Sequence, residues 1–152
     1  MNRSGLTRFI RLGQQVDPVI LDALRRGAPA EFKPALSYHF EVAGKRMRAA
    51  MVVLSCASAG GKVERAVKPA AVVEMIHNYS LVMDDLIDRG EVRRGRPSVR
   101  VVMGDSIALL VAMYYREVLR FDRAFASQRR RQKCRSEDYE GDNRWGTTGL
   151  VT

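Results

Sequence analysis

Cysteine is scarce in this sequence of 152 residues, with one at Cys56 in an apolar run and one at Cys134 in a polar run. Two cysteines in such different surroundings do not form the framework of a disulfide-stapled domain, so we expect a reducing compartment. Long apolar runs are also lacking, because the longest, 107–115, is shorter than the ~18 residues of a membrane span. The basic N-terminus has no apolar segment of the signal-peptide kind. We therefore expect a cytoplasmic protein, with a targeting segment at the N-terminus as the alternative.

Strand-like alternation of apolar and polar residues is missing too, as is any internal repeat, so the sequence predicts an all-α fold. Apolar residues recur at helical spacing, and Asp17 and Gly27 are the expected N-cap and stop of the first such segment. We expect helices at 17–26, 31–43, 45–60, 64–88, and from 98 or 105 to 125. The chain is then divided into a helical domain, 1–126, and a basic, disordered tail, 127–152.

Acidic residues are fewer than basic ones, since 17 Asp and Glu stand against 26 Lys and Arg and give a formal net charge of +9. Such a balance favours anionic partners, namely nucleic acid, anionic lipid or a diphosphate. Composition does not choose among these partners. The positions of the charged residues have to decide.

Three aspartates end the longest predicted helix. His77, Asp84 and Asp88 fall within about 40° of one another on a helical wheel, and Asp85 flanks them. Carboxylates four residues apart repel by a few tenths of a kcal/mol, so the pattern suggests that a cation normally lies between them. Hard oxygen ligands on one face suit Mg²⁺, which one or two carboxylates bind together with substrate phosphates.

Arginines follow the aspartates directly. Arg93 and Arg94 lie in the next turn of the chain, and the guanidinium fork is well matched to phosphate oxygens. Farther upstream, Lys45 and Arg48 lie one helical turn apart near an expected helix start, where the helix dipole also favours an anion. These charges could be a solvated face. Together with the acidic face they predict a metal-diphosphate site.

Three segments resemble the trans-isoprenyl diphosphate synthases. The run from Asp84 to Asp88 with Arg93-Arg94-Gly95 is similar to that family's DDxxD and RRG signature. Residues 44–48, GKRMR, resemble its GKRxR segment, and 76–81, IHNYSL, resemble its IHxxSL segment. A lone DDxxD is a weak signal, but three motifs in order are a strong one. The resemblance implies the front part of an isoprenoid-synthase helical bundle.

The resemblance also implies an activity, the head-to-tail condensation of isopentenyl diphosphate with an allylic diphosphate to give farnesyl or geranylgeranyl diphosphate. Mg²⁺ is the implied cofactor, with Asp84 and Asp88 as its ligands. The implied catalytic set is Asp84, Asp85, Asp88 and Arg93. The implied substrate-binding set is Lys45, Arg48, His77, Arg93 and Arg94.

The family places residues that limit product length just before its first aspartate, and here these positions hold Tyr79 and Ser80. Core packing is the other interpretation of Tyr79, because on the wheel it lies about 140° from Asp84. Family members form homodimers, which implies a homodimer here or an assembly with an intact synthase.

The sequence departs from the family in several places. Met83 stands where many members have a histidine, and Ala112-Met113 replace a usual Gly-Asp pair. The resemblance covers about residues 30–120, and the second aspartate-rich motif does not follow. We therefore expect a truncated chain with weak or no turnover alone. The alternative function is a non-catalytic helical module that partners an intact synthase or binds an anionic polymer through its tail, although nucleic acid is the less favoured partner.

Overall fold

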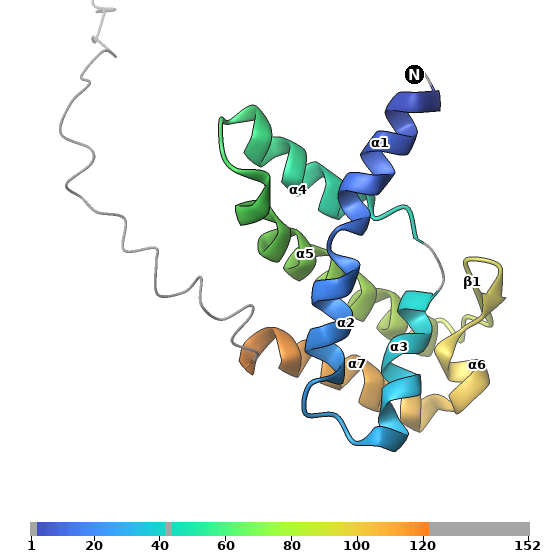
Figure 1. Cartoon of the computed structure of the whole chain (residues 1–152). Helices are drawn as coiled ribbons and strands as arrows, with labels where there is room; N and C mark the ends of the chain where they lie inside the picture. The colour runs from blue at the N-terminus through green and yellow to red at the C-terminus, as the bar shows by residue number, and fades with distance from the viewer. Residues whose placement is uncertain (1–2, 42–43, 122–152) are drawn as a thin grey trace, which may run out of the picture.

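Helices dominate the computed structural model, which describes residues 3–41 and 44–121 (Figure 1). The helices are α1 (Arg3–Gln14), α2 (Asp17–Arg25), α3 (Lys33–Glu41), α4 (Met47–Ser58), α5 (Val63–Ile87), α6 (Val99–Met103) and α7 (Asp105–Phe121), with a 3-10 turn η1 (Ala30–Phe32) before α3. A short antiparallel hairpin, β1 (Val92–Arg93) and β2 (Arg96–Pro97), follows α5. The expected tail, 127–152, lies outside the described residues. The prediction of an all-α fold is confirmed, with this small hairpin as an addition.

The long helix α5 is the centre of the bundle and packs against α4 and α7 (Figure 1). Its inner positions are small or flexible, since Ala66, Ala70, Ala71 and Met75 are all buried, and small residues let neighbouring helices approach closely. Pro69 lies inside α5 without ending it. The helix therefore runs uninterrupted from the α4 side of the bundle to the three aspartates.

Further core residues come from α2, α3 and α7. Ile20, Leu24 and Leu36 are fully buried, and the hydroxyl of Tyr115 donates a hydrogen bond of 2.7 Å to the backbone oxygen of Leu36. Burial raises the pKa of Tyr115, so this hydroxyl stays a donor at all ordinary pH values. The bond satisfies the one polar atom of a large aromatic core residue.

Several helix boundaries differ from the sequence expectation. Val16, not Asp17, is the N-cap residue of α2. Asp17 is the first residue of the helix, and its carboxylate accepts a hydrogen bond from Arg46. The expected helix 31–43 is a 3-10 turn followed by α3. Of the two starts expected for the last helix, 98 and 105, α7 has the second, because Gly104, whose φ of 84° only glycine adopts readily, separates it from the short α6.

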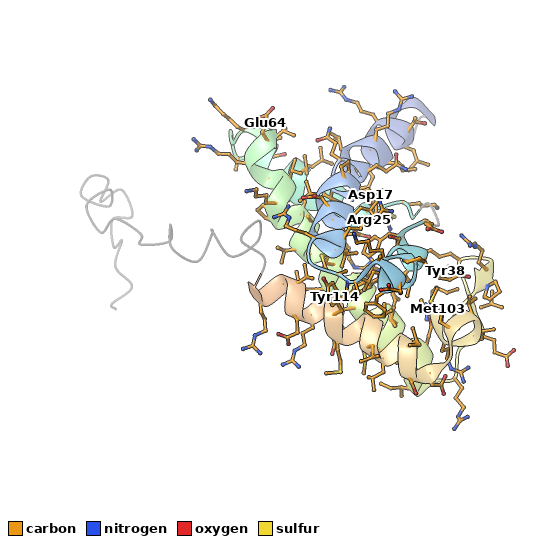
Figure 2. The ribbon with its side chains drawn as sticks, turned by 60° about the horizontal axis from the view of Figure 1, so that its bottom comes forward. Asp17, Arg25, Tyr38, Glu64, Met103 and Tyr114 are labelled. Carbon is orange, nitrogen blue, oxygen red and sulfur yellow. The ribbon has the colours of Figure 1, made fainter. Side chains whose placement is uncertain are left out.

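One face of the last two helices is apolar and exposed. Leu109, Leu110 and Met113 are 44%, 51% and 51% exposed, and the last two line a shallow groove with Phe32, Tyr114 and Glu117. Figure 2 shows Tyr114 on the α7 ribbon that carries this face. No helix of the described part is both long and apolar enough to cross a bilayer. A contiguous exposed apolar face of this kind is typical of a protein–protein contact.

We expect this apolar face to drive self-association of the chain in solution. Substituting Leu110→Glu places a charge on the face and should shift the chain toward monomer, because a buried unpaired charge is costly. Ser106→Glu, one turn earlier at an exposed polar position, is the matched control and should leave association unchanged. Light scattering coupled to size exclusion measures the mass. A parent chain that is monomeric at every concentration would contradict the expectation.

Candidate functional site

The exposed acids lie at the C-terminal end of α5. Asp84 and Asp88 are both exposed, and the backbone N–H of Asp88 donates to the oxygen of Asp84 at 2.8 Å, so the helical spacing continues through the helix cap. Neither carboxylate takes part in a hydrogen bond or ion pair with any residue the structure describes. Two free carboxylates one turn apart are therefore available to a cation.

Asp85 does not share that surface. Its side chain is buried, with 3% exposure of the residue, and it accepts hydrogen bonds from Arg93 through Nη2 at 2.6 Å and Nε at 3.2 Å. These bonds to Asp85 raise the pKa of Arg93. The expectation that Asp85 flanks the acidic face is corrected here, because the helix turns Asp85 toward the hairpin instead.

The hairpin carries both arginines of the RRG segment. Arg94 and Gly95 form its two-residue turn with positive φ angles of 54° and 77°, as a type I′ turn requires. The hydroxyl of Ser98 donates to the oxygen of Gly90 at 2.7 Å and closes the base of the hairpin. Gly90 lies so close to Asp85 that an added Cβ would be 2.6 Å from Oδ1. The glycine therefore allows the hairpin to approach α5.

Arg94 turns back toward the interior of the bundle. Its Nη2 lies 3.5 Å from the side-chain oxygen of Asn78, a long hydrogen bond. Partial burial lowers the pKa of Arg94, and the nearby charge of Arg46 adds to the effect. An arginine in this position gains from a bound anion, because the anion would offset both costs.

The basic pair at the start of α4 faces the middle of α5. Lys45 and Arg48 are exposed, and Nη1 of Arg48 donates to Nε2 of His77 at 3.1 Å. Partial burial, with the Arg48 charge next in importance, lowers the pKa of His77. The structure thus brings Arg48 and His77 together, although 29 positions separate them in the sequence.

Tyr79 and Ser80 lie on the same helix between the two sets. Ser80 donates its hydroxyl to the backbone oxygen of His77 at 2.8 Å, and Tyr79 is half-buried against the core. The packing of Tyr79 agrees with the structural interpretation of this residue.

Sequence reasoning missed a buried polar stripe on α5. Glu74, Asn78 and Asp85 are all buried, and they fall within about 40° of one another on the wheel. The stripe of the half-buried His77 and the exposed Asp84 and Asp88 is centred about 80° away. The signal was present as polar residues at helical spacing inside an otherwise apolar segment. Arg46, whose side chain is 0% exposed, was also missed.

His39, the other of the two histidines, lies on α3. It is buried, its Nε2 has no hydrogen-bond partner within the described ranges, and desolvation, with Arg94 next, lowers its pKa to about 3. It therefore stays neutral in the folded chain down to acidic pH. A neutral imidazole next to several arginines avoids a further positive charge in the interior.

We expect Asp85→Asn to destabilise the chain by about 1–2 kcal/mol, less than the 3–5 kcal/mol of a fully buried pair, because Arg93 keeps access to water. The exposed side chain of Asp88 offers the matched control. Asp88→Asn should change the free energy of unfolding by no more than about 0.5 kcal/mol. Urea denaturation at pH 7 measures both, and equal effects of the two variants would contradict a structural role for Asp85.

His39 should make the folded chain sensitive to acid. Its pKa is about 3 in the folded chain and 6.5 when unfolded, so the unfolded state binds more protons below pH 6.5 and stability falls as the pH drops. By pH 5 the loss should be about 2 kcal/mol. In His39→Gln this part of the pH dependence should disappear, as urea denaturation at pH 7 and pH 5 would show. Identical pH slopes in both proteins would contradict it.

Comparison with known proteins agrees with this arrangement. The family model for polyprenyl synthetase matches residues 29–121. The chain is 41% identical over 96 residues to a geranylgeranyl diphosphate synthase of Methanosarcina mazei, an alignment that covers 62% of this chain and 29% of the relative. It is 36% identical over 99 residues to the heterodimeric geranylgeranyl pyrophosphate synthase large subunit 2 of Arabidopsis thaliana, covering 64% and 26%. The chain thus spans about a quarter to a third of the length of these curated relatives.

Solved structures agree on the fold. A geranylgeranyl pyrophosphate synthetase of the archaeon Geoglobus acetivorans superposes with a TM-score of 0.64 at 29% identity, covering 71% of this chain and 36% of that one. An FPP/GFPP synthase of Zymomonas mobilis superposes with a TM-score of 0.67 at 28% identity, covering 77% and 44%. The resemblance found in the motifs is therefore confirmed, and so is the part of the helical bundle that they predicted. On the family match over most of its described residues, the chain belongs to the polyprenyl synthetase family.

Proposed function

We propose that this chain carries two diphosphate-binding sets of an isoprenyl diphosphate synthase and takes part in head-to-tail prenyl transfer. The single observation that most supports this is the approach of α4 and the hairpin to the C-terminal half of α5. The Arg48–His77 contact of 3.1 Å joins α4 to α5, and the Arg93–Asp85 contact of 2.6 Å joins the hairpin to the same helix. Basic side chains from two segments distant in the sequence thereby contact the helix that carries Asp84 and Asp88, and we infer that they bind phosphate.

The first set would bind the allylic diphosphate. Asp84 and Asp88 are exposed carboxylates without protein partners in the described ranges, which fits hard-oxygen ligation of Mg²⁺. The described residues contain no group of three or more His, Cys, Asp or Glu that could hold a metal alone. This agrees with a cation that shares its ligands with substrate phosphates. Mg²⁺, when bound, would neutralise phosphate oxygens and make the diphosphate a better leaving group.

The second set would bind isopentenyl diphosphate. Lys45 and Arg48 supply charge from the start of α4, His77 orients Arg48, and Arg94 reaches in from the hairpin turn. The side chains of Lys45, Arg48 and Arg94 can only donate hydrogen bonds, and the oxygens of a diphosphate accept them. Tyr79 and Ser80 would lie under the prenyl chain, where the size of their side chains would limit the product to farnesyl or geranylgeranyl diphosphate.

In this proposal the residues act on charge and position. Arg93, oriented by Asp85, would donate to the allylic diphosphate while the carbon–oxygen bond breaks and the electron pair leaves with the oxygen. Lys45, Arg48 and Arg94 would hold the second substrate so that its double bond attacks the allylic carbon. The new carbon–carbon bond forms, and the proton lost from the neighbouring carbon passes to the released diphosphate.

A second candidate function has support of its own. The exposed apolar face of α7 and the name of the Arabidopsis relative, a large subunit of a heterodimeric synthase, favour a role as one subunit beside another synthase chain. Such a role is compatible with diphosphate binding. It differs in requiring the partner for turnover.

We expect the chain to bind inorganic pyrophosphate more tightly with Mg²⁺ than without it, and Asp84→Asn with Asp88→Asn should lose this Mg²⁺ dependence. The double variant should also be slightly more stable, because the repulsion of a few tenths of a kcal/mol between the acids is removed. Calorimetric titration measures the binding. Glu91→Gln, an exposed acid nearby, is the control and should bind as the parent does. Equal affinity for pyrophosphate with and without Mg²⁺ would contradict the proposed role of the metal.

A further inference from the structure

Arg46 is a buried arginine in the middle of the basic segment that precedes α4. Its Nε donates to Oδ1 of Asp17 at 2.7 Å, and its Nη2 donates to the backbone oxygen of Phe40 at 3.3 Å. The guanidinium carbon lies 5.3 Å from the centre of the Phe40 ring. Asp17 begins α2 and Phe40 lies near the end of α3, so one side chain connects two helices to the start of a third.

The contacts continue from Arg46 along α5 to the hairpin. Nη1 of Arg46 lies 3.7 Å from Oε1 of Glu74, an ion pair with 0% and 3% exposed side chains. The amide of Asn78 donates to the same Oε1 at 3.4 Å, and its oxygen accepts from Nη2 of Arg94 at 3.5 Å. A continuous line of polar contacts therefore runs from α2 through α4 and α5 to the hairpin turn.

The backbone conformation of Arg46 determines where its own side chain and those of its neighbours point. Arg46 is the N-cap residue of α4, with φ 46° and ψ 39°, and its carbonyl accepts the N–H of Ala50 at 3.0 Å. In this left-handed conformation, which a residue with a Cβ adopts only at a cost, the chain turns sharply into α4. Lys45 and Arg48 flank the turn and are exposed, while Arg46 points inward.

Two glycines leave room for this arrangement. A Cβ at Gly13 of α1 would lie 2.3 Å from the backbone oxygen of Arg46. A Cβ at Gly44 would lie 2.7 Å from Nη1 of Arg46 and 3.0 Å from Nη1 of Arg94, so the two guanidiniums occupy neighbouring space above this glycine. The close packing fixes Arg46 relative to both α1 and the hairpin.

The charges of this cluster are costly to bury. Two arginines close together repel, and the carboxylates of Asp17 and Glu74 offset that repulsion. Nη1 of Arg46 and Oε2 of Glu74 have no hydrogen-bond partner among the described residues. Buried ion pairs of this kind add little net stability over apolar residues of the same size. Folding alone therefore gives little reason to keep the cluster.

We propose that Arg46 is a positioning residue which, through Glu74 and Asn78, places Lys45, Arg48 and Arg94 around one diphosphate without the help of a metal. The proposal rests on the proposed function for the identity of these three ligands. It adds that the buried line of contacts through Arg46, Glu74 and Asn78, and not the exposed charges alone, determines the affinity for the diphosphate. Removing a charge from the connection then has a different effect from removing a charge elsewhere.

The test is the affinity for inorganic pyrophosphate without Mg²⁺, measured by calorimetric titration of the full 152-residue chain. Arg46→Lys keeps the charge but cannot make the three contacts, and we expect binding to weaken by about tenfold, as when a partner behind a ligand is lost. Arg65→Lys, an exposed arginine on α5, is the matched control and should bind as the parent does.

The direction in which Glu74→Gln changes the affinity distinguishes a positioning role from an effect of the summed charge alone. Loss of a negative charge near a basic site should strengthen anion binding if only the summed charge matters. We expect it to weaken binding instead, because Arg46 loses the carboxylate of its ion pair, and the connection through Asn78 to Arg94 is disturbed. Glu64→Gln, at the far end of α5 (Figure 2), removes the same charge outside the cluster and should have no effect. Asp17→Asn, with a side chain that is 30% exposed, is the milder substitution if the others do not fold, and weaker binding is expected there too.

Unchanged or tighter binding in a folded Arg46→Lys, Glu74→Gln or Asp17→Asn chain overturns the proposal. No pyrophosphate binding by the parent without Mg²⁺ overturns it as well. Failure of the proposed function is seen separately, as the absence of the Mg²⁺-dependent part of binding that Asp84 and Asp88 would supply. The proposal is supported only if the three variants weaken the Mg²⁺-independent part while the Arg65 and Glu64 controls do not.

Discussion

The bidentate ion pair between Asp85 and Arg93 is the contact on which the site depends. A hairpin whose strands have only two residues each has little stability of its own, so side-chain contacts have to fix its position relative to α5. Asp85 provides them from inside the helix end, and Gly90 allows the approach. Because Arg93 is held this way, the next residue, Arg94, is also placed, with its side chain directed at Asn78.

The end of α5 is a poor place for acids on grounds of stability. Asp84 and Asp88 repel each other across one helical turn, and both lie at a helix C-terminus, where the helix dipole disfavours negative charge. The opposite problem arises where Arg46 and Arg94 crowd together over Gly44. Both costs would fall if a cation bound the first set and an anion the second. Part of the excess of positive charge in the chain is thus located at this site.

The two polar stripes of α5 have different roles. One stripe has the exposed Asp84 and Asp88 and the half-buried His77, where ligands could reach it. The buried stripe of Glu74, Asn78 and Asp85 contacts the arginines that approach from other elements. A single helix can do both because residues spaced by three or four return to the same face. The apolar face of α7 lies on another part of the bundle and presents a separate surface for association.

Local spacing determined much of this protein. Helical periodicity predicted the all-α fold and the long helix through Pro69, and the one-turn spacing of Asp84 and Asp88 predicted their shared face, because these features depend on neighbours within a few residues. Tertiary structure alone decided that Asp85 turns inward to Arg93, that Arg46 is buried, and that Arg48 meets His77 across 29 positions. Contacts of this second kind depend on how helices pack, and packing is settled by shape and burial over the whole bundle, which no short stretch of sequence specifies.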